Sequence, residues 1–262
     1  MPAPSVGRVT SPPMTRVSSG LAELDRMLHG GFLFSDSILL AGPAGTGKTM
    51  LTTHFIAAGV ANGERGVILV FEEQPNRYLE RVRSTGVDLR KMVADGDVEI
   101  LYLRPVDLSV DETLHIMVAL VNKLQARRLV IDSLSGFELA VAPSFRDDFR
   151  ESLYRTMATL SALGVTVMMT VEVLQSFTDL RFSPYEISFI ADTLILQRYV
   201  EMEGQLRRVL TILKMRGSAH DTRLRLYEVT DQGIHIGSSL EEYRGILTGI
   251  PGRIAKKKRR GR

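Results

Sequence analysis

The hydrophobic pattern of the chain alternates between two kinds of segment. Four short runs consist almost entirely of apolar residues: 37–41, 67–71, 129–132 and 165–169. Continuous rather than alternating hydrophobicity predicts strands that are buried on both faces. Between the runs, apolar side chains recur at helical spacing from 112 to 125 and from 147 to 163. We therefore expect an α/β fold, with a mostly parallel twisted sheet flanked by helices and joined by right-handed crossovers.

The pattern changes beyond residue 192. Three strand-like runs, at 193–196, 208–213 and 223–227, follow one another without a long helix between them. Turn-forming residues at 203–204 and 231–233 lie where these runs would reverse direction. We expect this part of the chain to form antiparallel strands at the edge of the sheet.

Composition places the chain among ordinary globular proteins. Of its 262 residues, 44% are hydrophobic and 24% are charged. The absence of cysteine excludes disulfides, thiolate zinc sites and cysteine nucleophiles, and the five histidines show no metal-ligand spacing. No apolar run approaches the ~18 residues of a membrane span, and the proline-rich start lacks a signal-peptide core. We expect a cytoplasmic protein with a flexible leader at 1–14, one folded domain at 15–253 and a basic, disordered tail at 254–262.

The net charge of +3 is unevenly distributed. Six positive charges lie between residues 256 and 262, so the remaining chain carries a net charge of −3. Proteins that bind nucleic acid usually carry a basic groove or stripe on the folded surface. The acidic body disfavours a recombinase-like or helicase-like DNA motor, although fold alone does not exclude one. The tail is either a solvated end or a contact for acidic partners or RNA.

Residues 42–49 match the phosphate-binding pattern G-x-x-x-x-G-K-[ST]. Glycines in this pattern let backbone N–H groups converge on phosphate oxygens at the start of a helix. Lys48 is expected to reach the β- and γ-phosphates, and the Thr49 hydroxyl to bind Mg²⁺. An apolar strand before the loop and an apolar-periodic helix after it complete the context. We expect Mg-ATP to bind here, on Gly45, Thr46, Gly47, Lys48, Thr49 and Met50.

Carboxylates follow two of the predicted strands. Asp132 ends the run at 129–132, where a second strand can place an acid on the magnesium shell. Glu72 and Glu73 end the run at 67–71, at the edge where open α/β sheets bind ligands. We expect one of these glutamates to orient or deprotonate the attacking group. The alternative is a pair of solvated loop acids.

The loop at 214–220 combines Lys214, Arg216, a glycine and His220. Two cations on one turn can clamp a triphosphate, or reach a neighbouring subunit's ATP as arginine fingers do. An ordinary basic turn is the alternative that the residues leave open.

Together these segments resemble the KaiC family of RecA-like ATPases, and most closely the C-terminal of the two ATPase halves found in the family's clock members. The resemblance extends from about residue 15 to residue 253. The residues that carry the resemblance are 16–21 with Leu24 and Asp25, the loop 42–49, the segments 71–73 and 131–135, the segments 192–196 and 199–201, and the segment 214–218 with His220.

This resemblance implies a homohexameric ring with ATP between subunits and a signalling or timing output. It implies that Glu72 and Glu73 are the paired catalytic glutamates, with Glu72 also near the magnesium, and that Lys48, Lys214 and Arg216 assist the chemistry. The nucleotide contacts it implies beyond the phosphate loop are Ser84, Arg208, Lys214, Met215, Arg216, Ser218 and His220.

Two departures from the family pattern bear on activity. Ser188 matches one of two neighbouring autophosphorylation acceptors, but Phe189 replaces the second, so a serine autokinase with a single acceptor is the alternative activity. Only one ATPase half is present, as in a stand-alone relative or an excised half. The segment 243–253 resembles an extension near the ring's pore that takes a regulatory protein; a packed surface strand or turn is the other interpretation.

Overall fold

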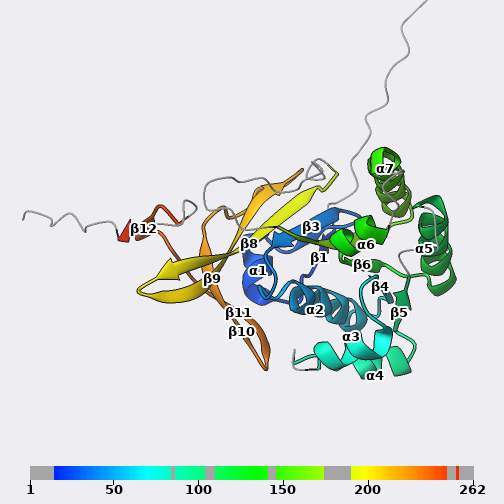
Figure 1. Cartoon of the computed structure of the whole chain (residues 1–262), viewed down its shortest axis with the longest axis horizontal. Helices are drawn as coiled ribbons and strands as arrows, with labels where there is room; N and C mark the ends of the chain where they lie inside the picture. Colours follow the sequence, from blue (N-terminus) through cyan, green and yellow to red (C-terminus); the bar gives the residue numbers. More distant parts are fainter. Residues whose placement is uncertain are drawn as a thin grey trace, which may run out of the picture.

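Among the residues that the structure describes, nine strands form one mixed sheet in the order β11-β10-β9-β8-β3-β7-β6-β4-β5 (Figure 1). The computed structural model describes residues 15–83, 86–103, 110–140, 146–173, 190–246 and 252–253, without the side chains of residues 110, 139–140, 146–148 and 253. Six strands run parallel: β3 (Ser37–Gly42), β4 (Gly66–Val70), β5 (Val98–Tyr102), β6 (Arg128–Asp132), β7 (Thr166–Glu172) and β8 (Thr193–Met202).

The remaining three strands of this sheet are antiparallel. They are β9 (Gln205–Met215), β10 (Arg225–Thr230) and β11 (Gly233–Ser239). Both expected turns are present, and Glu203 and Gly204 between β8 and β9 have φ angles of 55° and 72°. Two positive φ angles in a two-residue turn match the twist of a tight hairpin.

The expectation of an antiparallel edge strand holds only in part for the run 193–196, which pairs antiparallel with β9 but does not lie at the edge. These residues belong to β8, which lies inside the sheet and pairs in parallel with β3. Thr193 to Leu196 are buried, so their hydrophobicity belongs to an interior strand rather than an edge. The unpredicted strand β5 is the real edge on the other side, and its half-buried residues explain why no continuous apolar run announces it.

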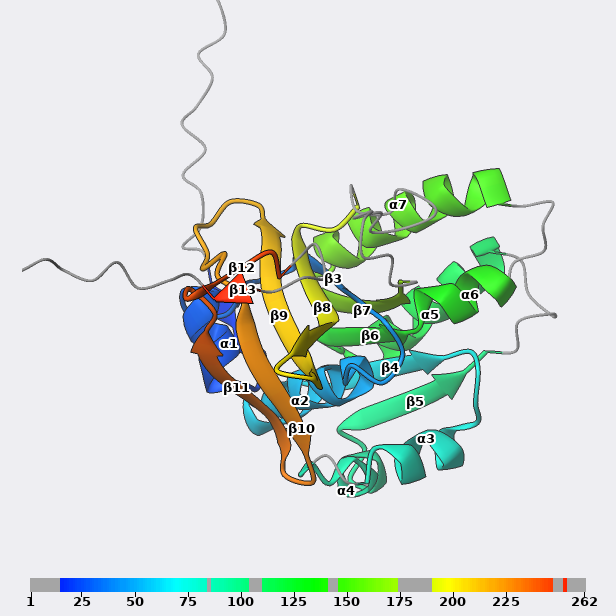
Figure 2. The same cartoon turned by 60° about the vertical axis from the view of Figure 1, so that its left-hand side comes forward.

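Helices cover both faces of the sheet (Figure 2). One face packs against α5 (Val110–Leu124), α6 (Leu134–Ala140) and α7 (Arg146–Ala162). The other face packs against α1 (Ala22–Met27), α2 (Lys48–Ala61), α3 (Pro75–Arg81) and α4 (Leu89–Ala94). Successive residues of β3 point to opposite faces, so Leu39 joins the first core and Leu40 the second.

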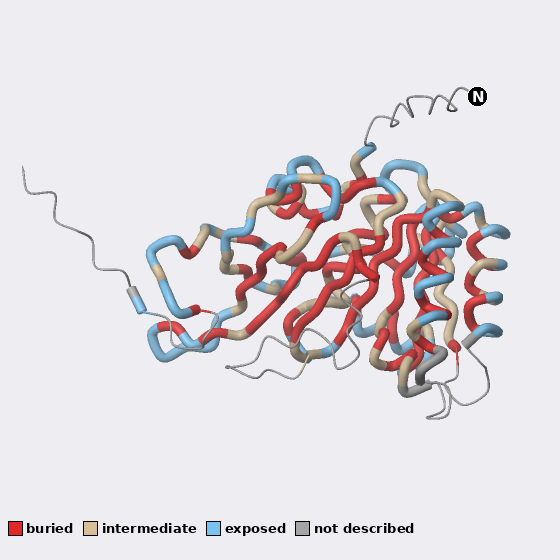
Figure 3. The backbone as a smooth tube through the Cα atoms, turned by 90° about the horizontal axis from the view of Figure 1, so that it is seen from above, coloured by how far each residue is buried: buried red, intermediate tan, exposed pale blue. Residues whose placement is uncertain are grey.

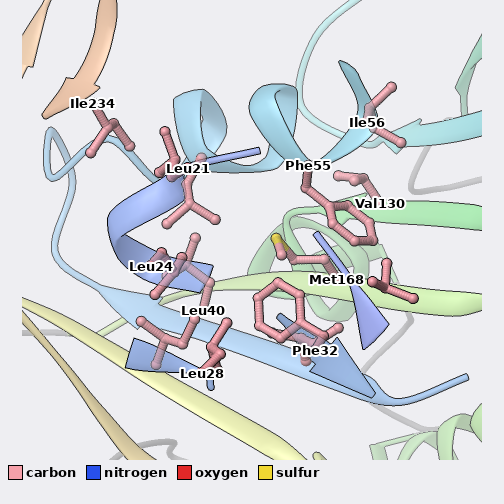
Figure 4. Packing of buried hydrophobic residues seen from close by; sticks show 14 of the residues in the cluster. Leu21, Leu24, Leu28, Phe32, Leu40, Phe55, Ile56, Val130, Met168 and Ile234 are labelled. Atoms are coloured by element: carbon pink, nitrogen blue, oxygen red, sulfur yellow. The ribbon is translucent and has the colours of Figure 1, made fainter. Parts of the chain in front are cut away.

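The core beneath α2 anchors the start of the phosphate loop. Figure 4 shows Leu40 of β3 among Leu24, Leu28 and Phe32, with Phe55 of α2 close to Val130 and Met168 of the neighbouring strands. Phe32 and Phe55 meet edge to face, with ring centroids 6.1 Å apart. The strands of the sheet are buried along most of their length, whereas the helices alternate buried and exposed residues (Figure 3). This packing holds β3 and α2, and with them the loop between, on a rigid support.

Smaller ladders lie outside the main sheet. β1 (Arg16–Val17) pairs with β2 (Phe32–Leu33), and β12 (Tyr243–Arg244) pairs with β13 (Gly252–Arg253). The ends of the segment 243–253 are therefore joined as antiparallel strands. Within the described ranges, no helix combines the length and the hydrophobicity needed to cross a bilayer.

Candidate active site

The phosphate loop connects the end of β3 to the first turn of α2. Gly45 and Gly47 have φ angles of 77° and 94°, and Gly47 is the residue that caps α2. A Cβ on Gly47 would lie 2.9 Å from a methyl carbon of Val229 in β10. The Tyr227 hydroxyl on the same strand donates to the Thr46 carbonyl at 2.6 Å. The loop is thus pressed onto β10, and only glycine fits at residue 47.

Lys48 lies back across the loop. Its Nζ donates to the carbonyl oxygens of Gly42 at 2.7 Å and Pro43 at 2.8 Å. Burial lowers the pKa of Lys48, while the carboxylates of Glu172, Asp132 and Glu72 act in the opposite direction.

Thr49 and Asp132, which are far apart in the sequence, meet at the start of α2. The Thr49 hydroxyl donates to Asp132 Oδ2 at 2.8 Å, and Thr170 on β7 donates to Oδ1 at 2.6 Å. Both carboxylate oxygens of Asp132 are therefore oriented by hydroxyl groups. A hydroxyl and a carboxylate are oxygen donors of the kind that Mg²⁺ prefers.

The paired glutamates have different partners. Glu72 accepts a hydrogen bond from the Ser133 hydroxyl at 2.8 Å, and a Cβ on Gly136 would lie 2.7 Å from Glu72 Oε1. Glu73 accepts from Arg81 Nε at 2.7 Å. The two acids are adjacent in sequence but are held by opposite walls of the site.

Arg81 and Glu172 are among the pocket residues that the sequence analysis missed. Arg81, at the end of α3, contacts Glu73, Thr49 and Asp132; burial acts to lower its pKa, but Asp132 and Glu73 outweigh that effect and raise it. Glu172 is the last residue of β7, much as Glu72 follows the end of β4. Extending the predicted run 165–169 by three residues would have included Glu172. No local pattern points to Arg81.

These groups line a pocket of about 550 Å³ at the carboxyl edge of the parallel strands. A triphosphate with its metal fits the residues present, because the left-handed glycines leave the loop free of side chains and the oxygen donors of Thr49 and Asp132 stand beside it. The pocket is bordered by the loop and the start of α2, and by Glu72, Glu73, Arg77, Arg81, Asp132, Ser133 and Glu172.

Residues of the loop 214–220 lie at the amino ends of the parallel strands, which form the edge of the sheet opposite the phosphate loop. Met215 is level with Thr193, which pairs with Ile38 at the beginning of β3, four residues before Gly42. That separation is roughly 13 Å along the strand. Lys214 Nζ donates to the Ala191 carbonyl at 2.7 Å, and Arg216 lies 3.5 Å from Asp192.

The other expected nucleotide contacts are divided between the two edges. Arg208 Nε donates to the Gly45 carbonyl at 3.3 Å, so it lies at this chain's own phosphate loop. Ser218 accepts from Arg16 at 2.7 Å, and both ring nitrogens of His220 are buried without a hydrogen-bond partner among the described residues. Ser84 and Ser188 lie outside the described residues.

Comparisons with known proteins agree with this architecture. The family model described as "ATPase: KaiC" matches residues 17–241. The chain is 35% identical over 236 residues to the circadian clock protein KaiC3 of Synechocystis, covering 90% of this chain and 46% of that protein. It is 34% identical over 240 residues to the circadian clock oscillator protein KaiC of Synechococcus elongatus, covering 91% and 46%. The chain spans about half the length of these relatives. With the fold and the phosphate loop, these matches show that the chain belongs to the KaiC family of ATPases.

Proposed function

We propose that this chain hydrolyses Mg-ATP as a homohexameric ring, with nucleotide at the subunit interfaces and a signalling or timing output. The observation that carries the proposal is the 2.8 Å contact between Thr49 and Asp132 beside the phosphate loop. It brings together one oxygen ligand from the start of α2 and one from the end of β6, at the point where a bound triphosphate needs its metal. The names of the relatives, circadian clock proteins, support the timing output.

The phosphate-loop residues and the acids of the pocket have separate roles in this proposal. Lys48 leaves the loop carbonyls and holds the phosphate oxygens, while Thr49 and Asp132 hold the metal, with Glu72 beside them. Magnesium, when bound, neutralises phosphate charge. Glu72, positioned by Ser133, and Glu73, positioned by Arg81, supply the carboxylate that orients or deprotonates the attacking water.

The ring supplies what one chain lacks. Lys214 and Arg216 lie at the far edge of the sheet from Gly42, so they cannot serve their own phosphate loop. A head-to-tail arrangement of subunits would bring that edge to a neighbour's pocket. We expect an isolated monomer to bind ATP weakly and hydrolyse it more weakly.

A hydrolysis assay tests the proposal. Lys48→Ala and the double variant Glu72→Gln/Glu73→Gln are expected to lose at least about 100-fold in turnover, because each removes a group that stabilises developing charge or activates water. Lys91→Ala, on the exposed face of α4, is the matched control. Undiminished turnover in either site variant would refute the assignment of those residues to the ATPase site. Native mass with and without Mg-ATP would show whether the ring forms.

Serine autophosphorylation is the second candidate, favoured by the glutamate pair and by the presence of Ser188. Intact mass after incubation with Mg-ATP is expected to increase by one phosphate that Ser188→Ala removes. Unchanged mass in the parent chain would retire this candidate while leaving hydrolysis untouched.

A further inference from the structure

Arg81 occupies a position in the pocket that the phosphate loop alone does not explain. Its Nη1 donates to the Thr49 hydroxyl oxygen at 2.9 Å and its Nε donates to Glu73 Oε1 at 2.7 Å. Its Nη2 lies 3.8 Å from Asp132 Oδ2. One guanidinium therefore touches the two oxygens of the Thr49–Asp132 pair and one of the paired glutamates.

This arrangement places a positive charge where the site would hold its metal. The Thr49 hydroxyl already donates its proton to Asp132, so the oxygen that would ligate a cation is the one that accepts from Arg81. Asp132 and Glu73 are mostly buried, with side chains 8% and 17% exposed. Their negative charge is compensated from within the chain by Arg81, whose own side chain is 48% exposed and can swing outward.

We propose that Arg81 is an internal counter-cation that competes with the divalent metal for Thr49 and Asp132, and so sets the metal affinity of this site. The inference rests on the proposed function, since it concerns the same pocket. A divalent cation and a guanidinium cannot share these oxygens, because like charges a few ångströms apart repel strongly in a partly buried pocket. Arg81 must leave before the metal enters, and it then becomes free to meet the phosphate oxygens.

Arg77 provides an internal comparison. It lies one turn earlier on α3 and lines the same pocket. It makes no hydrogen bond or ion pair with Thr49, Glu73 or Asp132, all of which the structure describes. Replacing either arginine by glutamine removes one positive charge from the pocket, so a difference between the two variants isolates the contact from the net charge.

The test uses Mn²⁺ as the probe, titrated into the nucleotide-free full chain and followed by the loss of the free-ion electron paramagnetic resonance signal. Arg81→Gln is expected to bind Mn²⁺ about tenfold more tightly than the parent, because a competing positive charge is gone. Arg77→Gln is expected to stay within about threefold, and Arg81→Lys to lie between, since lysine keeps the charge but loses the fork of donors. Equal affinities for Arg81→Gln and Arg77→Gln, or weaker Mn²⁺ binding by Arg81→Gln, would overturn the proposal.

A second titration separates this inference from the proposed function. ATP binding in EDTA is expected to weaken in Arg81→Gln, because a cation that can reach the phosphates is lost. General damage to the pocket would instead weaken both Mn²⁺ and ATP binding, which would count against the proposal. A parent chain that binds no ATP under any condition would contradict the proposed function, while the Mn²⁺ comparison would still decide the role of Arg81.

Discussion

The two edges of the sheet differ in how their charged groups are satisfied. At the phosphate-loop edge, Asp132 accepts hydrogen bonds from two hydroxyls, and the two glutamates have a hydroxyl and a guanidinium as partners. At the opposite edge, Asp36 has a buried carboxylate oxygen without a hydrogen-bond partner among the described residues, close to the charged pair of Asp192 and Arg216.

The difference shows that the acids of one edge are oriented by partners within the chain, whereas an acid of the other edge is not. Asp132, Glu72 and Glu73 at the first edge are each oriented by a hydroxyl or a guanidinium group. Cations at the second edge, Lys214 and Arg216, face a carbonyl and a carboxylate at the far end of the strands from the loop. In the proposed ring, this second edge would meet a neighbouring chain's nucleotide.

Mixing of variant subunits tests the difference between the two edges with the largest expected effect. Lys48→Ala and Arg216→Ala are each expected to lose at least about 100-fold in turnover, because one damages the first edge and the other the second. In a ring mixed from equal amounts, about a quarter of the sites would combine Lys48 of one subunit with Arg216 of its neighbour. Activity should therefore return to about a quarter of the parent value. Steady-state ATP hydrolysis after subunit exchange measures this.

A control mixture keeps the test sharp. Lys48→Ala mixed with Glu72→Gln/Glu73→Gln joins two defects of the same edge, so no site in such a ring is complete. Recovery in this control, or none in the first mixture, would contradict the assignment of Arg216 to a neighbour's site.

The pH dependence of stability tests the unsatisfied acid at the second edge. Burial and the nearby Asp192 raise the pKa of Asp36 to about 7. The folded chain then binds more protons than the unfolded chain between about pH 4 and pH 7, so stability falls as pH rises through this range. Asp36→Asn has no carboxyl group to titrate and therefore does not lose stability in this way. From pH 4 to pH 8, the difference in unfolding free energy between Asp36→Asn and the parent should shift in favour of the variant by about 2 kcal/mol.

Urea unfolding at both pH values measures this change. Asp231→Asn, an exposed acid in the turn between β10 and β11, is the control and should show no such trend. A pH-independent difference between Asp36→Asn and the parent would mean that Asp36 is ionised in the folded chain across this range.

A smaller effect is expected where the phosphate loop meets β10. Gly47 and Gly63 both have left-handed φ angles, of 94° and 77°, but a Cβ on Gly63 would meet nothing within 4 Å. Alanine at either residue carries the left-handed strain of about 1–2 kcal/mol. Gly47→Ala should cost about 1 kcal/mol more than Gly63→Ala, because its methyl group collides with Val229. Thermal unfolding of the two variants gives this difference, and equal losses would show that the loop is not pressed onto β10.

Local patterns were enough for the parts of the fold and the site that depend on local geometry. The apolar runs before Gly42 and Asp132 predicted two central strands, and the spacing of Gly42, Gly47, Lys48 and Thr49 predicted the loop between β3 and α2. Local patterns did not place β8, because a buried strand reads the same whether its neighbour is parallel or antiparallel. They also did not predict β5, because this half-buried edge strand has no continuous run of apolar residues.

By itself, the sequence determined a phosphate loop, an acid at the end of a second strand and membership of an ATPase family, because each depends on residues close together along the chain. Only the tertiary structure decided which groups meet. Strand order brings Thr49 to Asp132 and places Tyr227 beneath the loop, and the end of α3 delivers Arg81 to the same oxygens. Strand direction carries Lys214 and Arg216 to the opposite edge. These outcomes depend on how distant segments pack, and no spacing of residues along the chain records that.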